Sequence, residues 1–175
     1  LDHNNRILVS QGLARIRHGL GCAGIKALII VAKRQAEQLV AADLGFALGP
    51  RLNAAGRMDD MALGIQCLLS DDEESALAMA SELDGLNQER REVEATMQQQ
   101  ALESLDDLDL ESSDDLPFGL CLYDPNWHQG VIGILAARIK ERLFRPVIVF
   151  AAAGDGQIKG SARSVTGLHI RDVLD

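Results

Sequence analysis

The segment Lys159-Gly160-Ser161-Ala162-Arg163-Ser164 carries side chains that suit the binding of an anion. Side chains alternate between two faces in an extended segment, so Lys159, Ser161 and Arg163 would share one face. An ammonium group, a hydroxyl and a planar guanidinium on one face can hold a phosphate group. The alternative is a solvated β-edge whose charges prevent aggregation. The segment contains no general base, so we do not expect Ser161 to act as a nucleophile.

A second basic segment is Gly49-Pro50-Arg51-Leu52-Asn53-Ala54-Ala55-Gly56-Arg57. Its Gly and Pro residues predict a loop, and its small residues would let a ligand approach the backbone. Arg51 and Arg57 could then present their guanidinium groups to phosphate oxygens, with Asn53 beside them. The alternative is that both arginines pair with Asp59 and Asp60 and tie the loop down.

His128 precedes Gly130, where we expect a helix to begin. One interpretation is a half-buried imidazole that orders the loop before this helix. The other is a hydrogen-bond donor to a phosphate group that approaches the helix N-terminus. Both interpretations stay open, and His128 is counted among the candidate phosphate-binding residues.

Other motifs do not support a catalytic or metal site. Residues 19–24 match the G-x-G-x-x-G dinucleotide pattern, but a helical period precedes them where that motif needs a strand. Asp2 and His3 are too few to form a two-metal centre. Asp107 and Asp109 lie in an acid-rich run without a neighbouring His. We therefore expect no catalytic residue and no metal ligand in this chain.

The elements that must position these residues fall into two groups. In the first part, apolar spacing predicts helical structure at 4–20 and 35–42, an extended segment at 43–48, and helices at 59–69 and 71–105. The apolar run at 25–32 could be a helix or a strand, and we favour a helix. Asn4 and Asn5 are candidate caps for the first helix. In the second part, the order is a strand at 118–123, a helix at 130–144, a strand at 147–151 and a hairpin at 154–156 that leads into 157–163. Residues 168–175 read as a helix that has just begun.

Charge separates the same parts. Residues 71–117 hold sixteen acidic and two basic residues, a net charge of −14, whereas residues 1–70 and 118–175 carry +3 and +2. The total of −9 therefore does not argue against nucleic acid, because two mildly basic modules flank an acidic connector. Residues 108–116 are rich in acid and Ser and read as a linker.

Composition narrows the class of protein further. Hydrophobic residues make up 47% of the chain and aromatic residues 3%, so the cores must be aliphatic. No apolar run reaches the length of about 18 residues that a membrane span needs. Three cysteines (Cys22, Cys67 and Cys121) lack metal or disulfide spacing, which indicates buried thiols in a reducing cytoplasm.

Three motifs in sequence order closely resemble the RecJ family of the DHH phosphoesterase superfamily. They are GPRLNAAGRM at 49–58, WHQGVIGI at 127–134 and KGSARS at 159–164. The resemblance covers essentially the whole chain, including Leu86, Asn87 and Arg90 on the long predicted helix. Base-stacking aromatic residues would normally accompany such motifs, but few are present here.

The resemblance implies an α/β fold in three parts. Residues 1–80 would be the helical C-terminal part of a DHH domain. Residues 81–115 would form a connector helix and acidic linker. Residues 116–175 would be the N-terminal half of a mixed-sheet α/β DHH-associated domain. The chain starts with Leu rather than Met, so we expect an internal fragment of a longer parent protein.

The resemblance also implies a function for that parent protein: stepwise 5′-to-3′ hydrolysis of single-stranded DNA with Mn²⁺ or Mg²⁺, in DNA repair and recombination. The metal ligands would lie before Leu1, so this fragment would bind no metal and have no activity of its own. By this resemblance, Ser161 and Arg163 match positions that bind the terminal 5′-phosphate or the nearby backbone of the strand. Arg51, Asn53 and Arg57 match a segment that faces the substrate channel.

The implied partners are single-stranded DNA and, through the parent protein, single-strand-binding protein and a helicase. We expect a cytoplasmic monomer without membrane contact. Two alternatives are a DHH phosphoesterase that acts on oligoribonucleotides or cyclic dinucleotides, and a non-catalytic nucleic-acid-binding module. A dinucleotide-binding oxidoreductase would rest on residues 19–24 alone.

Overall fold

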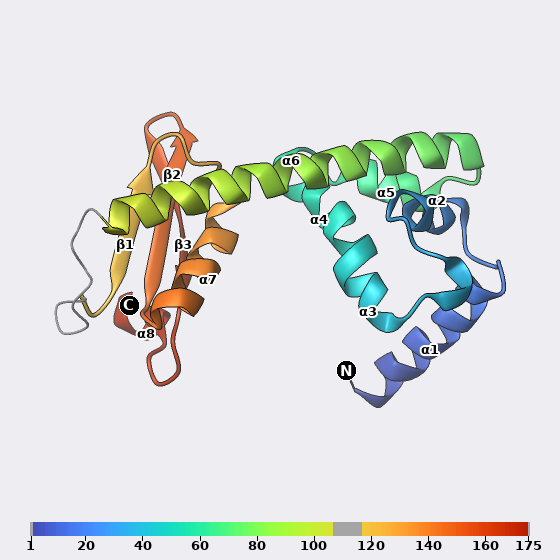
Figure 1. The fold of residues 1–175 in the computed structure, drawn as a ribbon, viewed down its shortest axis with the longest axis horizontal. Coiled ribbons are helices and arrows are strands. Elements are labelled where there is room, and N and C mark those ends of the chain that lie inside the picture. The colour runs from blue at the N-terminus through green and yellow to red at the C-terminus, as the bar shows by residue number, and fades with distance from the viewer. Residues whose placement is uncertain (1, 107–116, 175) are drawn as a thin grey trace. The chain divides into compact units, whose positions relative to one another are not determined.

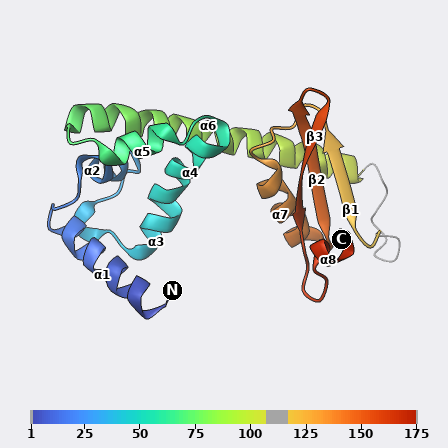
Figure 2. The ribbon, with the colours of Figure 1, turned by 180° about the vertical axis from the view of Figure 1, so that it is seen from behind.

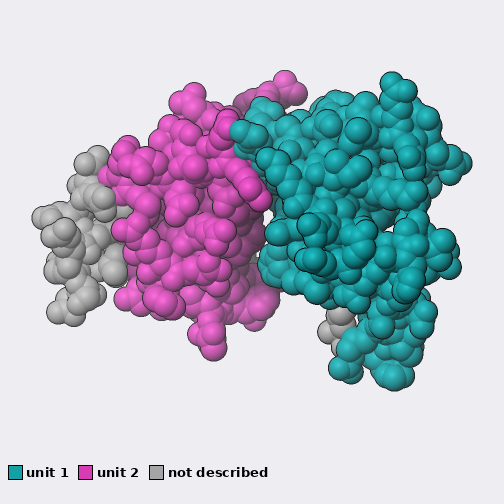
Figure 3. Space-filling view, turned by 45° about the vertical axis from the view of Figure 1, so that its right-hand side comes forward, with its two compact units in different colours: residues 1–90 teal, residues 91–175 magenta. Residues whose placement is uncertain are grey.

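The computed structural model describes residues 2–106 and 117–174, and these form two compact units. Unit 1 is Leu1–Arg90 and unit 2 is Arg91–Asp175 (Figure 3). The division falls inside one long helix, α6 (Glu73–Asp106). The predicted linker at 108–116, like Asp107, lies outside the described residues.

Unit 1 is helical (Figure 1). It contains α1 (His3–Arg17), α2 (Ala23–Val31), the 3-10 turn η1 (Ala36–Gln38), α3 (Ala41–Asp43), the π-helix η2 (Leu44–Leu48), α4 (Gly49–Met58) and α5 (Ala62–Leu69). Residues 18–22 connect two helices, so the glycine pattern at 19–24 does not follow a strand. The cap of α1 is Asp2, whose Oδ1 accepts a hydrogen bond from the Asn5 N–H at 2.8 Å, so the prediction of Asn4 or Asn5 as the cap was wrong. A carboxylate also suits the positive end of the helix dipole.

The basic segment at 49–57 is a helix, so the prediction of a loop was wrong. The prediction of an extended segment at 43–48 was also wrong, because η2 runs directly into α4. Pro50 lacks an N–H and its ring would crowd the carbonyl four residues before it in a regular helix. The wider π turn places the Gly49 N–H on the Leu44 oxygen instead, so the chain enters α4 without breaking.

The core of unit 1 joins residues from most of its helices. Fully or almost fully buried members include Leu28, Leu39, Leu48, Ala55, Cys67 and Leu83. Burial raises the pKa of the Cys67 thiol. Cys22 and Cys121 are exposed, so the expectation of three buried thiols holds for Cys67 alone.

Two helices of unit 1 approach very closely at Gly24. A Cβ atom at this position would lie 2.7 Å from the backbone carbon of Cys67 and 2.9 Å from Cα of Leu68. These distances are far shorter than van der Waals contact, so only glycine lets α2 pack against α5 in this way.

Unit 2 is a three-stranded mixed sheet with helices, in agreement with the predicted α/β module. Its strands are β1 (Leu120–Asp124), β2 (Val147–Gly154) and β3 (Gln157–Arg163), in the order β1-β2-β3. The first pair is parallel and is connected through α7 (Ile132–Leu143), and the second pair is antiparallel. The predicted hairpin at 154–156 is confirmed, with positive φ angles at all three residues. The last described element is α8 (Ile170–Leu174).

One face of the sheet is covered and supplies the core of unit 2. Val147, Val149 and Ala151 on β2 are fully buried, and α7 packs against β2 and β3. Figure 2 shows the sheet from the other side, where the strands pass in front of the last part of α6. No helix among residues 2–106 and 117–174 is long and apolar enough to cross a membrane.

Candidate nucleic-acid interface

The three candidate residues on β3 share the covered face of the sheet. Arg163 pairs with Val147, Ser161 with Val149 and Lys159 with Ala151. Paired residues point to the same side of a sheet, so these polar side chains lie on the side of α7. Ser161 and Arg163 are half-buried and Lys159 is exposed.

Ser161 and Arg163 lie against the first turn of α7. A Cβ atom at Gly133 would be 3.0 Å from Nη2 of Arg163 and 3.1 Å from Oγ of Ser161. Gly133 therefore gives both side chains room beside the helix N-terminus. Arg163 is held in place because its Nη1 donates to Oγ of Ser161 at 3.2 Å and to the Ala162 oxygen at 2.8 Å.

The first turn of α7 favours an anion. Val131 occupies its N-cap position and provides no side-chain hydrogen bond. The dipole of a helix concentrates partial positive charge at such an end. The Arg163 guanidinium, the Ser161 hydroxyl and this helix end lie together, and we call this group of hydrogen-bond donors the α7 cradle.

His128 lies in the loop before α7 and is half-buried. Its Nδ1 accepts a hydrogen bond from the Gly130 N–H at 3.1 Å. In the neutral ring the proton is then on Nε2, which leaves that nitrogen as the donor. This geometry matches the interpretation of His128 as a residue that orders the loop, and it keeps one donor for a ligand.

The three candidate residues on α4 do not share one face of the helix. Asn53 and Arg57 are exposed and lie one turn apart. Arg51 turns inward: its side chain is 13% exposed and its Nη2 lies 2.8 Å from Oδ1 of Asp84 on α6. Its Nη1 donates to the Ala47 oxygen at 2.6 Å.

The interactions of Arg51 differ from both interpretations of the sequence. Its ion-pair partner is Asp84 rather than Asp59 or Asp60. Asp60 instead accepts a hydrogen bond from the Ala62 N–H at the start of α5. The Arg51 guanidinium therefore ties α4 to α6 and does not present an open fork.

Aromatic side chains do not add a stacking platform to the α7 cradle. Trp127 is 6% exposed, and its Nε1 donates to Oε1 of Gln100 at 3.0 Å. Tyr123 is exposed, but its pairing with Phe150 places it on the face of the sheet opposite to Ser161 and Arg163. Neither of these two rings therefore adds a stacking surface to the hydrogen-bond donors of the α7 cradle.

Two residues that matter here were missed as individual candidates. Gly133 was included only as part of the motif at 127–134. It gives room to two side chains of β3, and the sequence does not show that β3 lies beside it. Asp84 is 33 positions from Arg51 and no local pattern connects them. A glycine in the first turn of an amphipathic helix was the available signal for the first of these.

The described residues do not fit a metal centre. Within residues 2–106 and 117–174, no group of three or more His, Cys, Asp or Glu side chains could hold a metal ion. Asp109 lies outside the described residues.

Comparison with known proteins identifies the neighbours of this chain. Residues 117–175 match the model of the DHHA1 domain. The whole chain is 62% identical to a protein of Dickeya dadantii and 60% identical to one of Escherichia coli K12, both described as single-stranded-DNA-specific exonuclease RecJ. The chain spans 30% of the length of each of these relatives.

Solved structures give the same result. A crystal structure of RecJ from Thermus thermophilus in complex with Mg²⁺ superposes with a TM-score of 0.79 at 32% identity, over 97% of this chain and 25% of that one. A crystal structure of exonuclease RecJ bound to manganese also gives 0.79 at 32% identity, over 97% of this chain and 40% of that one.

Proposed function

Because this chain belongs to the RecJ family and spans 30% of the length of its relatives, we propose that it is the phosphate-binding segment of a 5′-to-3′ single-strand-specific DNA exonuclease. The observation that supports this role most is the α7 cradle, where Arg163 and Ser161 meet an uncapped helix N-terminus. A site of this composition suits a terminal phosphate group.

The proposed layout follows the family. Residues 1–80 would close the catalytic DHH domain, residues 81–115 would connect it, and residues 116–175 would begin the DHH-associated domain. The match of the DHHA1 model to residues 117–175 supports the last of these assignments.

In the proposed mechanism, the α7 cradle binds the 5′-phosphate and so sets the direction of degradation. Arg163 donates to the phosphate oxygens, Ser161 adds a hydroxyl donor, and the dipole of α7 favours the negative charge. Lys159 and Nε2 of His128 would contact the same phosphate or the next one. Asn53 and Arg57 would contact the backbone of the strand from α4, and Arg51 would hold α4 against α6. Phosphate contacts carry no base information, so degradation would be independent of sequence.

The metal ions of the reaction would be held outside this chain. Related RecJ structures contain Mg²⁺ or Mn²⁺, and we propose the same ions for the parent protein. When bound, these ions would supply an activated water and stabilise charge on the scissile phosphate. The described residues of this chain would bind and orient the strand.

The proposal also covers the location, oligomeric state and partners of the parent protein. The family resemblance implies a cytoplasmic monomer that acts on single-stranded DNA. It also implies that the parent protein contacts single-strand-binding protein and a helicase.

The test compares 5′-phosphorylated and 5′-hydroxyl strands as substrates of the parent protein and of its Arg163→Ala variant. A charged hydrogen bond to phosphate contributes about 1.5–3 kcal/mol, so the preference for the phosphorylated strand should fall by about ten- to hundredfold. Arg163→Lys should restore little, because an ammonium group cannot donate as a bidentate fork.

Arg6→Ala is the matched control, since Arg6 is exposed on α1 and the change should alter cleavage within about twofold. An unchanged ratio between the two substrates in Arg163→Ala would show that Arg163 does not read the terminal phosphate. The solvated β-edge would then be the better interpretation of β3.

A further inference from the structure

Unit 1 contains a polar pocket that the assignments above do not use. It has a volume of about 280 Å³ and is lined by Lys33, Arg34, Gln35, Gln38 and Asp43. These residues follow α2 and reach the end of α3. We call it the α2 pocket.

Hydrogen-bond donors dominate the α2 pocket. Lys33 contributes an ammonium group, Arg34 a guanidinium, and the two glutamines contribute amide groups. Asp43 is the one acid in the lining, and both of its oxygens are engaged. Its Oδ1 lies 3.2 Å from Nε of Arg34, and its Oδ2 accepts from the Val40 N–H at 3.0 Å. Asp43 therefore orients Arg34 by Nε and leaves the terminal guanidinium nitrogens to a ligand.

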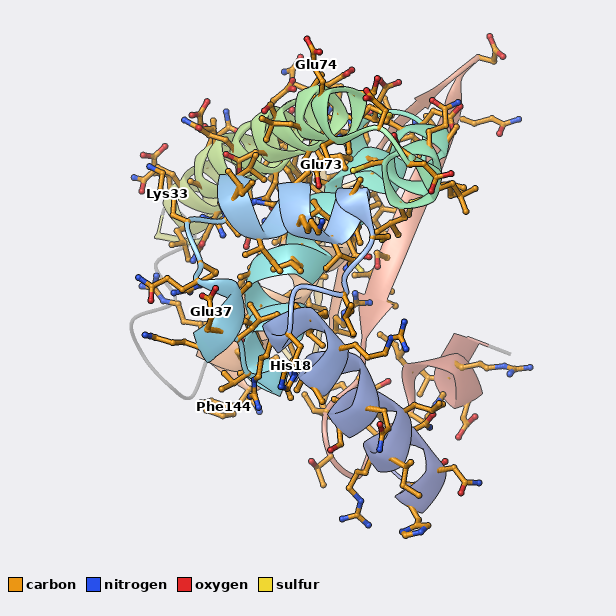
Figure 4. The ribbon with its side chains drawn as sticks, turned by 90° about the vertical axis from the view of Figure 1, so that its right-hand side faces the viewer. His18, Lys33, Glu37, Glu73, Glu74 and Phe144 are labelled. Atoms are coloured by element: carbon orange, nitrogen blue, oxygen red, sulfur yellow. The ribbon has the colours of Figure 1, made fainter. Side chains whose placement is uncertain are left out.

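Lys33 lies at the end of α2, and Glu37 lies on the turn that follows (Figure 4). Glu37 does not line the pocket, so the lining carries two positive charges and one negative charge. Within residues 2–106 and 117–174, Lys33 forms no ion pair. Its ammonium group is thus available to an anion.

The backbone of Lys33 adopts a conformation that a lysine residue rarely takes. Its φ angle is +53°, in the left-handed region where glycine is favoured. The Lys33 N–H donates to the Ile30 oxygen and the Arg34 N–H to the Ile29 oxygen, which is the pattern of a helix end that normally uses glycine. The chain therefore keeps a lysine side chain at a position where glycine would be more stable.

We propose that the α2 pocket binds a phosphate group of the nucleic-acid backbone, with Lys33 and Arg34 as its charged contacts and Gln35 and Gln38 as further donors. The pocket lies just below the usual range of about 300–1,000 Å³ for small-molecule sites, which suits one phosphate group rather than a whole ligand. This inference rests on the proposed function only for the source of the phosphate.

The sharpest test is Lys33→Gly, because the backbone and the side chain predict effects of opposite sign. Removal of left-handed strain should raise the Tm of the chain by about 2 °C. Loss of one phosphate contact should weaken binding of a labelled 5′-hydroxyl oligothymidylate by about five- to tenfold and reduce the slope of log K against log salt by about 1. Fluorescence anisotropy and thermal unfolding of the 175-residue chain measure both quantities.

Phe144 provides a matched control. It also has a φ angle of +53°, it ends α7, and it is 79% exposed. Phe144→Gly should therefore raise Tm to a similar extent and leave binding of the oligonucleotide unchanged. Lys33→Gln, which removes the charge and keeps the strained backbone, should weaken binding without raising Tm.

Three results would overturn the inference. The first is wild-type affinity and salt slope in both Lys33 variants. The second is displacement of the labelled oligonucleotide by polyglutamate of the same charge, as effectively as by unlabelled oligonucleotide and only when Lys33 is present. That result would indicate that the pocket binds an acidic peptide. The third is a Lys33-dependent rise in Tm with inorganic phosphate but no Lys33-dependent binding of the strand, which would indicate free phosphate. Arg163→Ala tests a different site, so failure at Lys33 with loss of 5′-phosphate preference at Arg163 leaves the proposed function standing.

Discussion

At the scale of single residues, Gly133 controls the room available to the α7 cradle. The hypothetical Cβ distances of 3.0 Å to Arg163 and 3.1 Å to Ser161 are tighter than ordinary contacts. Nη2 is the far end of a flexible side chain, so Arg163 would move aside in a Gly133→Ala variant. If the α7 cradle binds the 5′-phosphate as proposed, the preference of the parent protein for 5′-phosphorylated strands should fall in this variant. Tm should stay constant or rise, since Ala favours helix over Gly by about 0.5–1 kcal/mol.

Gly12→Ala is the control for this prediction. Gly12 lies inside α1, and a Cβ there would meet nothing within 4 Å. The change should stabilise the helix to a similar extent and leave substrate preference unaltered. A Gly133→Ala variant with full 5′-phosphate preference would mean that Arg163 does not need its present position.

The sequence predicted which side chains share a face of a strand better than it predicted which charged side chains form ion pairs. The alternation of Lys159, Ser161 and Arg163 on one face agrees with the register of β3. The ion pair of Arg51 with Asp84 could not be predicted, because it joins residues far apart in the sequence. For Arg51, the neighbouring residues Asp59 and Asp60 were the natural but wrong choice of partner.

At the scale of elements, the contact between α2 and α5 depends on Gly24. A side chain there would collide with the backbone of Cys67, and backbone cannot rotate away as a side chain can. We expect Gly24→Ala to destabilise the chain by about 1–3 kcal/mol or more, by forcing the helices apart. Urea unfolding monitored by circular dichroism measures this loss.

Gly45→Ala is the comparison for Gly24. A Cβ at Gly45 would meet nothing within 4 Å, although the residue also lies in a helical segment of unit 1. Equal stability losses in the two variants would show that the close approach at Gly24 is not the cause.

The start of α6 should make stability depend on pH. Hydrogen bonds from the Ser75 hydroxyl and then from its backbone N–H lower the pKa of Asp72 below its usual range. A carboxyl group whose folded pKa is lowered stabilises the fold above its unfolded pKa, and this contribution is lost as the pH falls through the folded pKa. Asp72→Ala should therefore lower Tm at neutral pH, and the difference from wild type should shrink below about pH 4.

Thermal unfolding from about pH 7 to pH 2 tests this dependence. Asp71→Ala is the control, because Asp71 is a neighbouring exposed carboxylate that forms no hydrogen bond within the described residues. A Tm difference for Asp72→Ala that is constant over the whole range would contradict the assignment.

Strong periodicity of apolar residues predicted the helices and strands well, whereas Gly and Pro residues led to a wrong prediction. The long helix expected at 71–105 is α6, and the strand, helix and hairpin of unit 2 lie close to their predicted positions. The prediction of a loop at 49–57 was wrong because Gly49 and Pro50 were interpreted as helix breakers. Pro50 lies in the first turn of α4, where its missing N–H costs little, and η2 absorbs its ring.

At the scale of the whole molecule, we expect DNA binding without DNA hydrolysis. We expect the 175-residue chain to bind single-stranded DNA but not to degrade it with Mn²⁺ or Mg²⁺, since its described residues offer no metal centre. Incubation of highly purified chain with labelled strands, with and without EDTA, checks this expectation. EDTA-sensitive degradation that co-purifies with the chain and disappears in its variants would contradict it.

The burial of Trp127 has a spectroscopic consequence. Trp127 is the single tryptophan of the chain and Tyr123 the single tyrosine, and both lie in unit 2. Near-ultraviolet absorbance and emission from these two residues therefore report on unit 2, whereas much of the helical ellipticity comes from unit 1. Transfer of the indole from the core to water should shift its emission to the red when unit 2 opens. Emission and ellipticity recorded on one sample would thus reveal whether the two units melt together or in sequence, without an added label.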